Sequence, residues 1–248
     1  MMSSQNSRNN SLQQTRPDTK PDAGFLSAPT LAALLLIFVL GTAAIYHATD
    51  SFRVVSTEDG RRLAIAEHPR QIPEAAVSYA NGQQLQLSQA LHSDSRVAIV
   101  TFIYTRCNTI CSILGTELQQ MQGHLQQRGL QQQLRLLSIS FDDSDGPAEL
   151  SAYAKRMQAN PKEWQFMRVN NAVQRQALLD SFGIVVVPAP LGEFQHNAAF
   201  HVVTPDGKLA RIFDYDEPDA ALEYAAALSQ QQTPLAQKQH TTAHQAAL

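Results

Sequence analysis

The stretch from Val97 to Met121 constrains the fold of this chain more than any other. Its first eight residues are rich in β-branched and aromatic side chains, which predicts a buried strand. In its last third, apolar residues recur at helical spacing and are flanked by Gln and Glu. This pattern predicts a helix. Cys107 and Cys111, the only two cysteines of the protein, lie between the two. The sequence therefore predicts a strand that brings two thiols to the start of a helix.

The position and spacing of Cys107 and Cys111 indicate a reactive pair. The partial positive charge at a helix N-terminus favours thiolate over thiol. Thiolate is the nucleophile of disulfide exchange and a soft ligand for copper(I) or zinc. Two helical cysteines four residues apart lie on one face, one turn apart, which suits chelation of one metal ion. A disulfide also becomes possible if the first cysteine lies just ahead of the helix. A purely structural disulfide and two buried, unreactive cysteines are the alternatives.

The rest of the chain predicts alternating strands and helices. A second strand is expected at 134–141. One helix is expected to begin at Pro147, and another to span 172–182. This order implies parallel strands with right-handed crossovers. Strands at 198–204 and 209–213 follow, around a turn at Pro205-Asp206-Gly207, and then a helix at 219–228.

These elements predict an α/β, thioredoxin-like fold with a central mixed sheet flanked by helices. Asn81-Gly82 lies between two alternating runs and predicts an N-terminal β-hairpin extension. The expected organisation is a disordered tail at 1–24, a transmembrane anchor at 25–47, a connector at 48–72 with a small strand-turn-strand, the thioredoxin-like domain at 73–231 and a disordered tail at 232–248.

The segment from Phe25 to Tyr46 contains no charged residue and is long enough to span a bilayer as one helix. A cleaved signal peptide is the main alternative, and a buried helix of a soluble domain is a weaker one. Basic residues on the two sides of the segment nearly balance, so they do not orient it. The cysteine chemistry favours a single-pass protein of the inner membrane with its C-terminal domain on the periplasmic side. The net charge of −3 gives no electrostatic case for binding nucleic acid.

Three blocks of sequence resemble a known family. They are FIYTRCNTIC, SISFDDSDGPAELSAYAKRM and FQHNAAFHVVTPDGKLARIF, and together they look like the signature blocks of the SCO/SenC family. The resemblance covers roughly residues 73 to 230. It implies a membrane-anchored copper protein of thioredoxin-like fold that assembles the dinuclear copper centre of cytochrome c oxidase. It also implies that Cys107, Cys111 and His196 are the copper ligands.

The chemistry of these three residues agrees with the resemblance. Two thiolates suit copper(I), and an added imidazole lets the same site hold copper(II). Zinc would accept the same ligands with a water, so the residue types do not exclude it. His201 falls within the following strand and is interpreted as a core or surface strand residue. Asp142 and Asp145 are interpreted either as guides for a partner or metal, or as members of a solvated loop.

Two functions remain open from the sequence. The first is a metallochaperone that binds copper and delivers it to the copper-bearing subunit of cytochrome c oxidase, or exchanges it with another copper chaperone. The alternative is a thiol-disulfide oxidoreductase of the cell envelope, in which Cys107 and Cys111 form the redox pair. The sequence therefore leaves open whether the protein is an enzyme. A peroxide-reducing relative of the same fold is disfavoured by the spacing of the cysteines.

Overall fold

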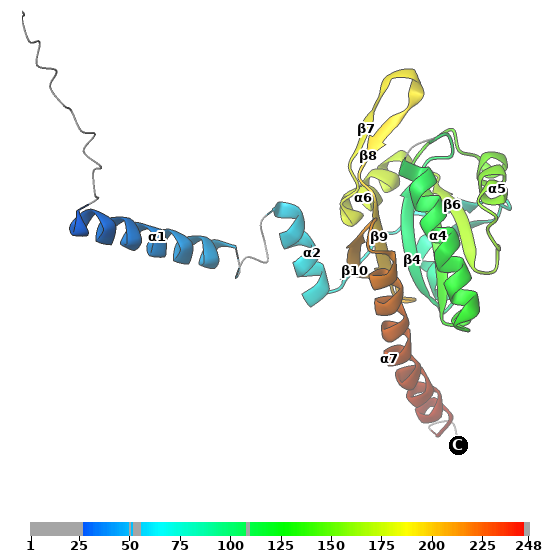
Figure 1. Cartoon of the computed structure of the whole chain (residues 1–248). Coiled ribbons are helices and arrows are strands. Elements are labelled where there is room, and N and C mark those ends of the chain that lie inside the picture. Colours follow the sequence, from blue (N-terminus) through cyan, green and yellow to red (C-terminus); the bar gives the residue numbers. More distant parts are fainter. Residues whose placement is uncertain (1–26, 50, 52–55, 108–109, 246–248) are drawn as a thin grey trace, which may run out of the picture. The chain divides into compact units, whose positions relative to one another are not determined.

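A computed structural model describes residues 27–49, 51, 56–107 and 110–245, without the side chains of 110–113, 191 and 232–245. The chain divides into two compact units, Met1–Arg53 and Val54–Leu248. Helix α1 (Ala28–Ala48) lies in the first unit. Figure 1 shows the sheet, the other helices and a projecting hairpin, all of which belong to the second unit.

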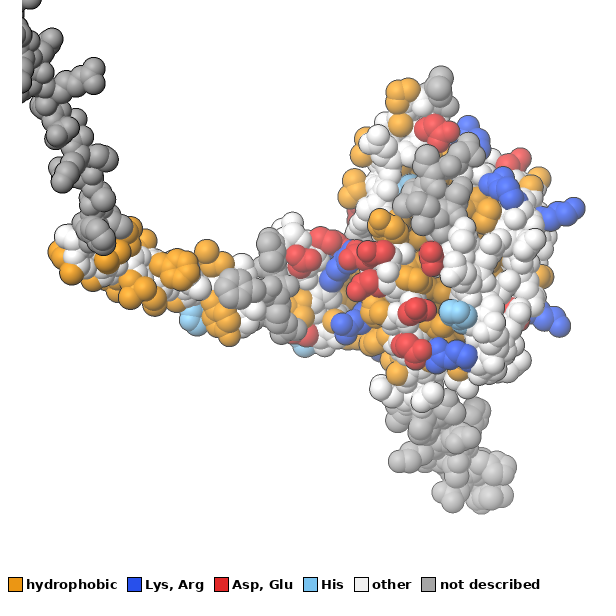
Figure 2. Space-filling model, viewed as in Figure 1, with side chains coloured by type: hydrophobic (Ala, Val, Ile, Leu, Met, Phe, Trp, Pro, Cys, Tyr) orange, Lys and Arg blue, Asp and Glu red, His pale blue; other side chains and the backbone are white. Residues whose placement is uncertain are grey.

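Helix α1 is apolar on all sides. It has 21 residues and no buried side chain, and its surface in Figure 2 is almost entirely hydrophobic. Within the described part of the chain it is the one helix whose length and composition suit a membrane span. A signal sequence near the N-terminus would have the same properties.

Helix α2 (Thr57–Glu67) replaces the strand-turn-strand expected in the connector, and that prediction is wrong where the structure describes it. The expected first strand, 53–55, lies outside the described residues. A capping box explains the helix: the Ser56 hydroxyl accepts from the Asp59 amide at 3.1 Å, and the Asp59 carboxylate accepts from the Ser56 amide at 2.9 Å. Gly60 lies within this helix, directly after the capping residues Ser56 and Asp59.

An eight-stranded mixed sheet forms the centre of the second unit, in the order β1-β10-β9-β4-β5-β6-β2-β3. Strands β4, β5 and β6 are parallel, whereas β9 and β2 join them antiparallel. The fold class expected from the sequence is confirmed. The strand bounds are β1 Arg70–Gln71, β2 Ala76–Tyr79, β3 Gln84–Gln86, β4 Val97–Ile103, β5 Leu134–Ser140, β6 Trp164–Val169, β9 Ala199–Val203 and β10 Lys208–Asp214.

The helices cover this sheet, and most match the expected segments. Their bounds are α3 Leu87–His92, α4 Ile110–Gln127, α5 Pro147–Arg156, α6 Ala172–Phe182 and α7 Pro218–Gln245. Helix α7 continues well beyond the expected end at 228, because its Ala- and Gln-rich sequence is a good helix former. Strand β6 was not among the strands expected from the sequence.

The parallel pairing of β4 and β5 creates the place where a site can form. Both strands are fully buried and end at the same edge, where the Phe141 amide donates to the Ile103 carbonyl at 3.1 Å. The segment after β4 carries Cys107, and the segment after β5 carries Asp142 and Asp145. Ends of parallel strands at one sheet edge are a common location for binding sites.

Gly183 ends α6 in the left-handed conformation, with φ of +69°. A Cβ atom there would collide with the Arg61 guanidinium of α2, which lies against this glycine. We expect Gly183→Ala to lower the free energy of unfolding by roughly 1–2 kcal/mol. Gly123→Ala is the matched control, because a Cβ in that helical position meets open space; it should stabilise by roughly 0.5–1 kcal/mol. Urea unfolding of the full chain in detergent micelles measures both, and equal effects would contradict this account.

Candidate functional site

Cys107 lies in the short turn that joins β4 to α4. Its amide donates to the Tyr104 carbonyl at 3.3 Å, and its side chain is only 3% exposed. Cys111 lies in the first turn of α4, so the predicted strand-to-helix placement is confirmed for the backbone. The side chain of Cys111 and residues 108–109 lie outside the described part of the structure.

Asp145 supports this turn through three hydrogen bonds to its carboxylate. Its carboxylate accepts from the Thr105 amide at 2.8 Å, from the Thr105 hydroxyl at 2.5 Å and from the Ser140 hydroxyl at 2.6 Å. Asp145 is only 1% exposed, so the alternative of a solvated loop is wrong for this residue. The Arg156 guanidinium donates to the Thr105 carbonyl at 2.9 Å and fixes the same residue from the other side. The backbone two residues before Cys107 is therefore tied to the body of the domain.

Asp142 is also buried, and it pairs with Arg106 at 2.8 Å. Burial opposes its ionisation, but hydrogen bonds from Arg106 and Ser144 outweigh burial and lower the pKa of Asp142 below its ordinary value. The carboxylate is thus ionised at neutral pH and committed to the neighbour of Cys107. Asp142 orders the turn; it does not extend into solvent toward a partner.

His196 reaches the same region from a different part of the chain. Strands β7 (Val186–Pro188) and β8 (Phe194–His196) form a hairpin that projects from the domain, with a 3-10 turn at Pro190–Gly192 (Figure 1). The half-buried His196 ring packs edge-on against Phe141 at 5.0 Å between centroids, and lies 6.1 Å from the Tyr104 ring. Its Nδ1 lies 2.9 Å from the Asn197 carbonyl. When Nδ1 donates this hydrogen bond, the lone pair is on Nε2, the nitrogen that a metal would take.

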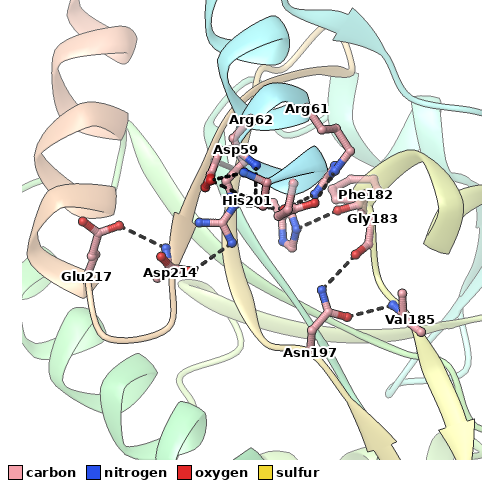
Figure 3. Close-up of polar contacts among 12 residues, drawn as sticks. Asp59, Arg61, Arg62, Phe182, Gly183, Val185, Asn197, His201, Asp214 and Glu217 are labelled. Carbon is pink, nitrogen blue, oxygen red and sulfur yellow. Dashed lines mark hydrogen bonds and ion pairs between the residues drawn. The ribbon is translucent and has the colours of Figure 1, made fainter. Parts of the chain in front are cut away.

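Asn197 clamps the base of this hairpin. Its side-chain amide donates to the Gly183 carbonyl at 2.9 Å and accepts from the Val185 amide at 2.7 Å (Figure 3). The two ends of the hairpin are therefore held together next to the C-terminus of α6. The residue after His196 is part of the support that places the imidazole.

His201 lies in β9 and is completely buried, so its interpretation as a strand residue of the core is confirmed. Its Nδ1 and Nε2 each lie 3.2 Å from a backbone carbonyl, those of Val100 and Phe182 (Figure 3 labels Phe182). Burial lowers the pKa of His201 to about 4, although the carbonyl hydrogen bonds act in the opposite direction.

The structure brings Cys107 and His196 to the same aromatic residue, Tyr104. The Tyr104 carbonyl accepts from the Cys107 amide at 3.3 Å, and the phenol ring lies edge-on to the His196 ring at 6.1 Å between centroids. Among the described side chains, no three His, Cys, Asp or Glu residues gather into a metal-binding group. Because the Cys111 side chain is not described, the set of Cys107, Cys111 and His196 stays a prediction. The donor types are a thiol and an imidazole, which fit copper and zinc.

Sequence reasoning did not identify Tyr104 and Glu193 as part of this region. Tyr104 was expected only as the last residue of the buried strand, and Glu193 was assigned no role. The Tyr104 hydroxyl donates to the Glu193 carboxylate at 2.6 Å, across 89 positions in the chain. No local pattern announces such a contact. The nearest sequence signal is that Tyr104 stands three residues before Cys107, and Glu193 three before His196.

Comparison with known proteins gives a matching family, a curated relative and solved structures of the same fold. A family model described as SCO1/SenC matches residues 79–231. A curated relative, the "SCO1 protein homolog" of Bacillus subtilis, is 30% identical over 122 residues, which are 48% of this chain and 62% of that protein. The matched region thus spans less than two thirds of the curated relative's length.

Solved structures share the fold. "Arabidopsis thaliana ScoI with copper bound" has a TM-score of 0.56 at 14% identity, covering 65% of this chain and 99% of the other. A "SCO1/SenC family lipoprotein" of Bacillus anthracis has a TM-score of 0.55 at 17% identity, covering 64% and 98%. At these identities the likeness establishes the fold of the second unit.

Proposed function

Because this chain belongs to the SCO1/SenC family, we propose that it is a membrane-anchored protein that binds copper and delivers it to the dinuclear copper site of cytochrome c oxidase, or prepares the cysteines of that site. This membership confirms the resemblance read from the three sequence blocks. The proposed ligands are Cys107, Cys111 and His196. The proposed partner is the copper-bearing oxidase subunit or another copper chaperone.

The observation that carries this proposal is that Tyr104 contacts both Cys107 and His196. Cys107 follows β4 of the main sheet and His196 ends β8 of the separate hairpin, yet Tyr104 accepts from the Cys107 amide and packs its ring against His196. When copper is bound, two thiolates and an imidazole would supply ligands for both of its oxidation states. The buried turn excludes water from Cys107. The hydrogen bond from Nδ1 of His196 selects the tautomer whose Nε2 has a free lone pair for a metal.

The alternative function, thiol-disulfide exchange, is less well supported by the geometry. Exchange begins when a thiolate attacks a partner's sulfur, so it requires access to the sulfur. Cys107 is only 3% exposed. A small ion reaches such a sulfur more readily than a second protein does. Copper binding followed by ligand exchange is therefore the function we put first.

We also propose where the protein acts. Helix α1 would anchor it in the inner membrane as a single span, and the second unit would lie on the periplasmic side. The support for this orientation is the cysteine pair, since disulfides form and persist outside the reducing cytoplasm. One solved structure of the same fold, from Bacillus anthracis, is described as a SCO1/SenC family lipoprotein.

The test is copper titration of the full chain in detergent micelles, with His196→Ala compared with the parent. We expect one copper per chain and a copper(II) affinity reduced at least about 100-fold by the substitution, with a smaller loss for copper(I), which two thiolates can hold. His68→Ala, which removes an exposed histidine of the same unit, is the matched control and should change neither affinity. Cys107→Ser should abolish both. A copper(II) spectrum that survives in His196→Ala would overturn the ligand assignment.

A copper-free parent that exchanges rapidly with a model disulfide would instead support the oxidoreductase. That measurement uses the same reduced protein and a dye-labelled disulfide. His196→Ala should leave such exchange largely unchanged, because the imidazole is not a sulfur nucleophile.

A further inference from the structure

The hairpin that carries His196 is not part of the main sheet. Strands β7 and β8 pair only with each other and form a separate two-stranded sheet within the described residues. An isolated two-stranded hairpin is at best marginally stable in water. The side chains of Val185 and Val187 on this hairpin are at least half exposed. Its position relative to the cysteine turn must therefore come from side-chain contacts.

Tyr104 makes the most direct of these contacts. Its side chain is only 1% exposed, and its hydroxyl donates to the Glu193 carboxylate at 2.6 Å. The same oxygen lies 3.2 Å from the Phe194 carbonyl and accepts from the Phe194 amide at 3.4 Å. One phenol oxygen thus holds the residue before β8 and the first residue of β8. His196 lies two positions further along the same short strand.

Tyr104 also meets the cysteine side of the site. It directly follows β4, and its carbonyl accepts from the Cys107 amide at 3.3 Å. One residue thus has its backbone fixed beside Cys107 and its hydroxyl bonded to Glu193, an arrangement suited to fixing the distance between the two segments.

Aromatic packing cannot replace this hydrogen bond. The Tyr104 ring lies edge-on to Phe194 at 5.2 Å, and Phe141 packs against Phe194 at 5.6 Å and against His196 at 5.0 Å. Such edge-on contacts tolerate sliding of the rings, because their energy changes little over a broad range of separations. A short hydrogen bond to a charged acceptor is directional and roughly twice as strong as a neutral one. The phenol hydroxyl therefore fixes the position of the hairpin, which the ring contacts alone would allow to vary.

We propose that Tyr104 and Glu193 are positioning residues, which hold the β7–β8 hairpin so that His196 faces Cys107. This proposal rests on the proposed function only in naming the ion that His196 and Cys107 share. The hydroxyl acts through the hairpin and does not ligate the metal. Glu193 contributes its carboxylate as the acceptor, which keeps that carboxylate turned toward the phenol.

The test compares Tyr104→Phe, Glu193→Ala and Glu193→Gln with the parent, using the full chain in detergent micelles. The first readout requires no copper: hydrogen–deuterium exchange of the metal-free protein. We expect amides of 185–196 to exchange about 10-fold faster in Tyr104→Phe and in Glu193→Ala, while the amides of β4 keep their protection. Glu193→Gln keeps an acceptor oxygen and should restore most of the protection.

The second readout is copper affinity in the same variants. Tyr104→Phe should weaken copper(II) binding about 10- to 100-fold and change copper(I) binding less than about 3-fold, because only the imidazole is displaced. The double variant Tyr104→Phe/Glu193→Ala should lose no more than either single one, as expected for two residues that form one interaction. Tyr215→Phe, at an exposed tyrosine outside the hairpin, is the matched control and should behave like the parent.

The two proposals fail in different ways. If His196→Ala weakens copper(II) binding but Tyr104→Phe changes neither hydrogen exchange nor affinity, the positioning proposal is overturned and the ligand assignment stands. If the hairpin loosens in Tyr104→Phe while neither it nor His196→Ala affects copper, the positioning holds and the metal assignment falls. A loss of protection throughout β4 would mean that the hydroxyl acts on global folding, which also overturns the positioning role.

Discussion

Asp145→Ala is expected to lower the free energy of unfolding by roughly 2–4 kcal/mol. The carboxylate accepts three hydrogen bonds in a nearly solvent-free position, from the amide and hydroxyl of Thr105 and from the hydroxyl of Ser140. Alanine leaves these donors without an acceptor and opens a cavity beneath the turn. Urea unfolding of the full chain in micelles measures the loss.

Asp143→Ala is the matched control from the same loop. Asp143 is exposed and pairs with Arg175 at the surface, so its removal should change the free energy of unfolding by less than about 1 kcal/mol. Asp145→Asn should also destabilise, because its amide nitrogen would place a donor against other donors. The account fails if Asp145→Ala is no less stable than Asp143→Ala.

Asp145→Ala should also change the reactivity of Cys107. Thr105 lies two residues before Cys107, and the Asp145 carboxylate accepts from both the amide and the hydroxyl of Thr105. When this hold is lost, the thiol should be exposed more often and react faster with a maleimide. Measured under conditions where the variant is still folded, faster alkylation would link the buried carboxylate to the site, whereas an unchanged rate would limit Asp145 to a role in stability.

Acidification is expected to destabilise the protein through His201. The ordinary pKa of histidine, about 6.5, applies to the unfolded chain, whereas burial lowers the pKa of His201 to about 4 in the folded protein. Between these two values the unfolded chain binds more protons, so stability falls as the pH falls. His201 should account for a loss of about 2 kcal/mol between pH 7 and pH 5, and about 3 kcal/mol in total by pH 4. Well above pH 6.5, where this histidine is neutral in the unfolded chain as well, its contribution is complete and constant.

His201→Phe tests this effect through the slope of the free energy of unfolding against pH. Phenylalanine fills the site between Phe102 and Phe182 but cannot take up a proton, so the stability change between pH 7 and pH 5 should shrink by about 2 kcal/mol. The comparison does not depend on how stable the variant is at neutral pH, because only the difference between the two pH values is used. An unchanged slope would mean that another group carries the acid sensitivity.

Local patterns in the sequence were enough for much of the fold. The expected helix at 172–182 coincides with α6, which begins after Asn171, whose side chain caps it. The Asn81-Gly82 hairpin and the buried strand before Cys107 are also as expected, with Gly82 at φ of +84°. These elements follow from periodicity and turn chemistry, which act over a few residues. The connector shows the limit of local patterns, because its residues suit both a turn and a capped helix, and the capping box of Ser56 and Asp59 starts a helix there.

From the sequence came the prediction of which residues carry the chemistry: two cysteines at a strand-to-helix turn and, through the resemblance, one histidine before a later strand. Only the tertiary structure decided how they are supported. Asp145 lies 40 residues from Thr105, and Glu193 lies 89 residues from Tyr104, yet each pair is joined by a short hydrogen bond. Contacts at such separations depend on where the parallel strands end and on the path of the β7–β8 hairpin. Periodicity reports which face of an element is buried, but it carries no information about the partner that the face will meet.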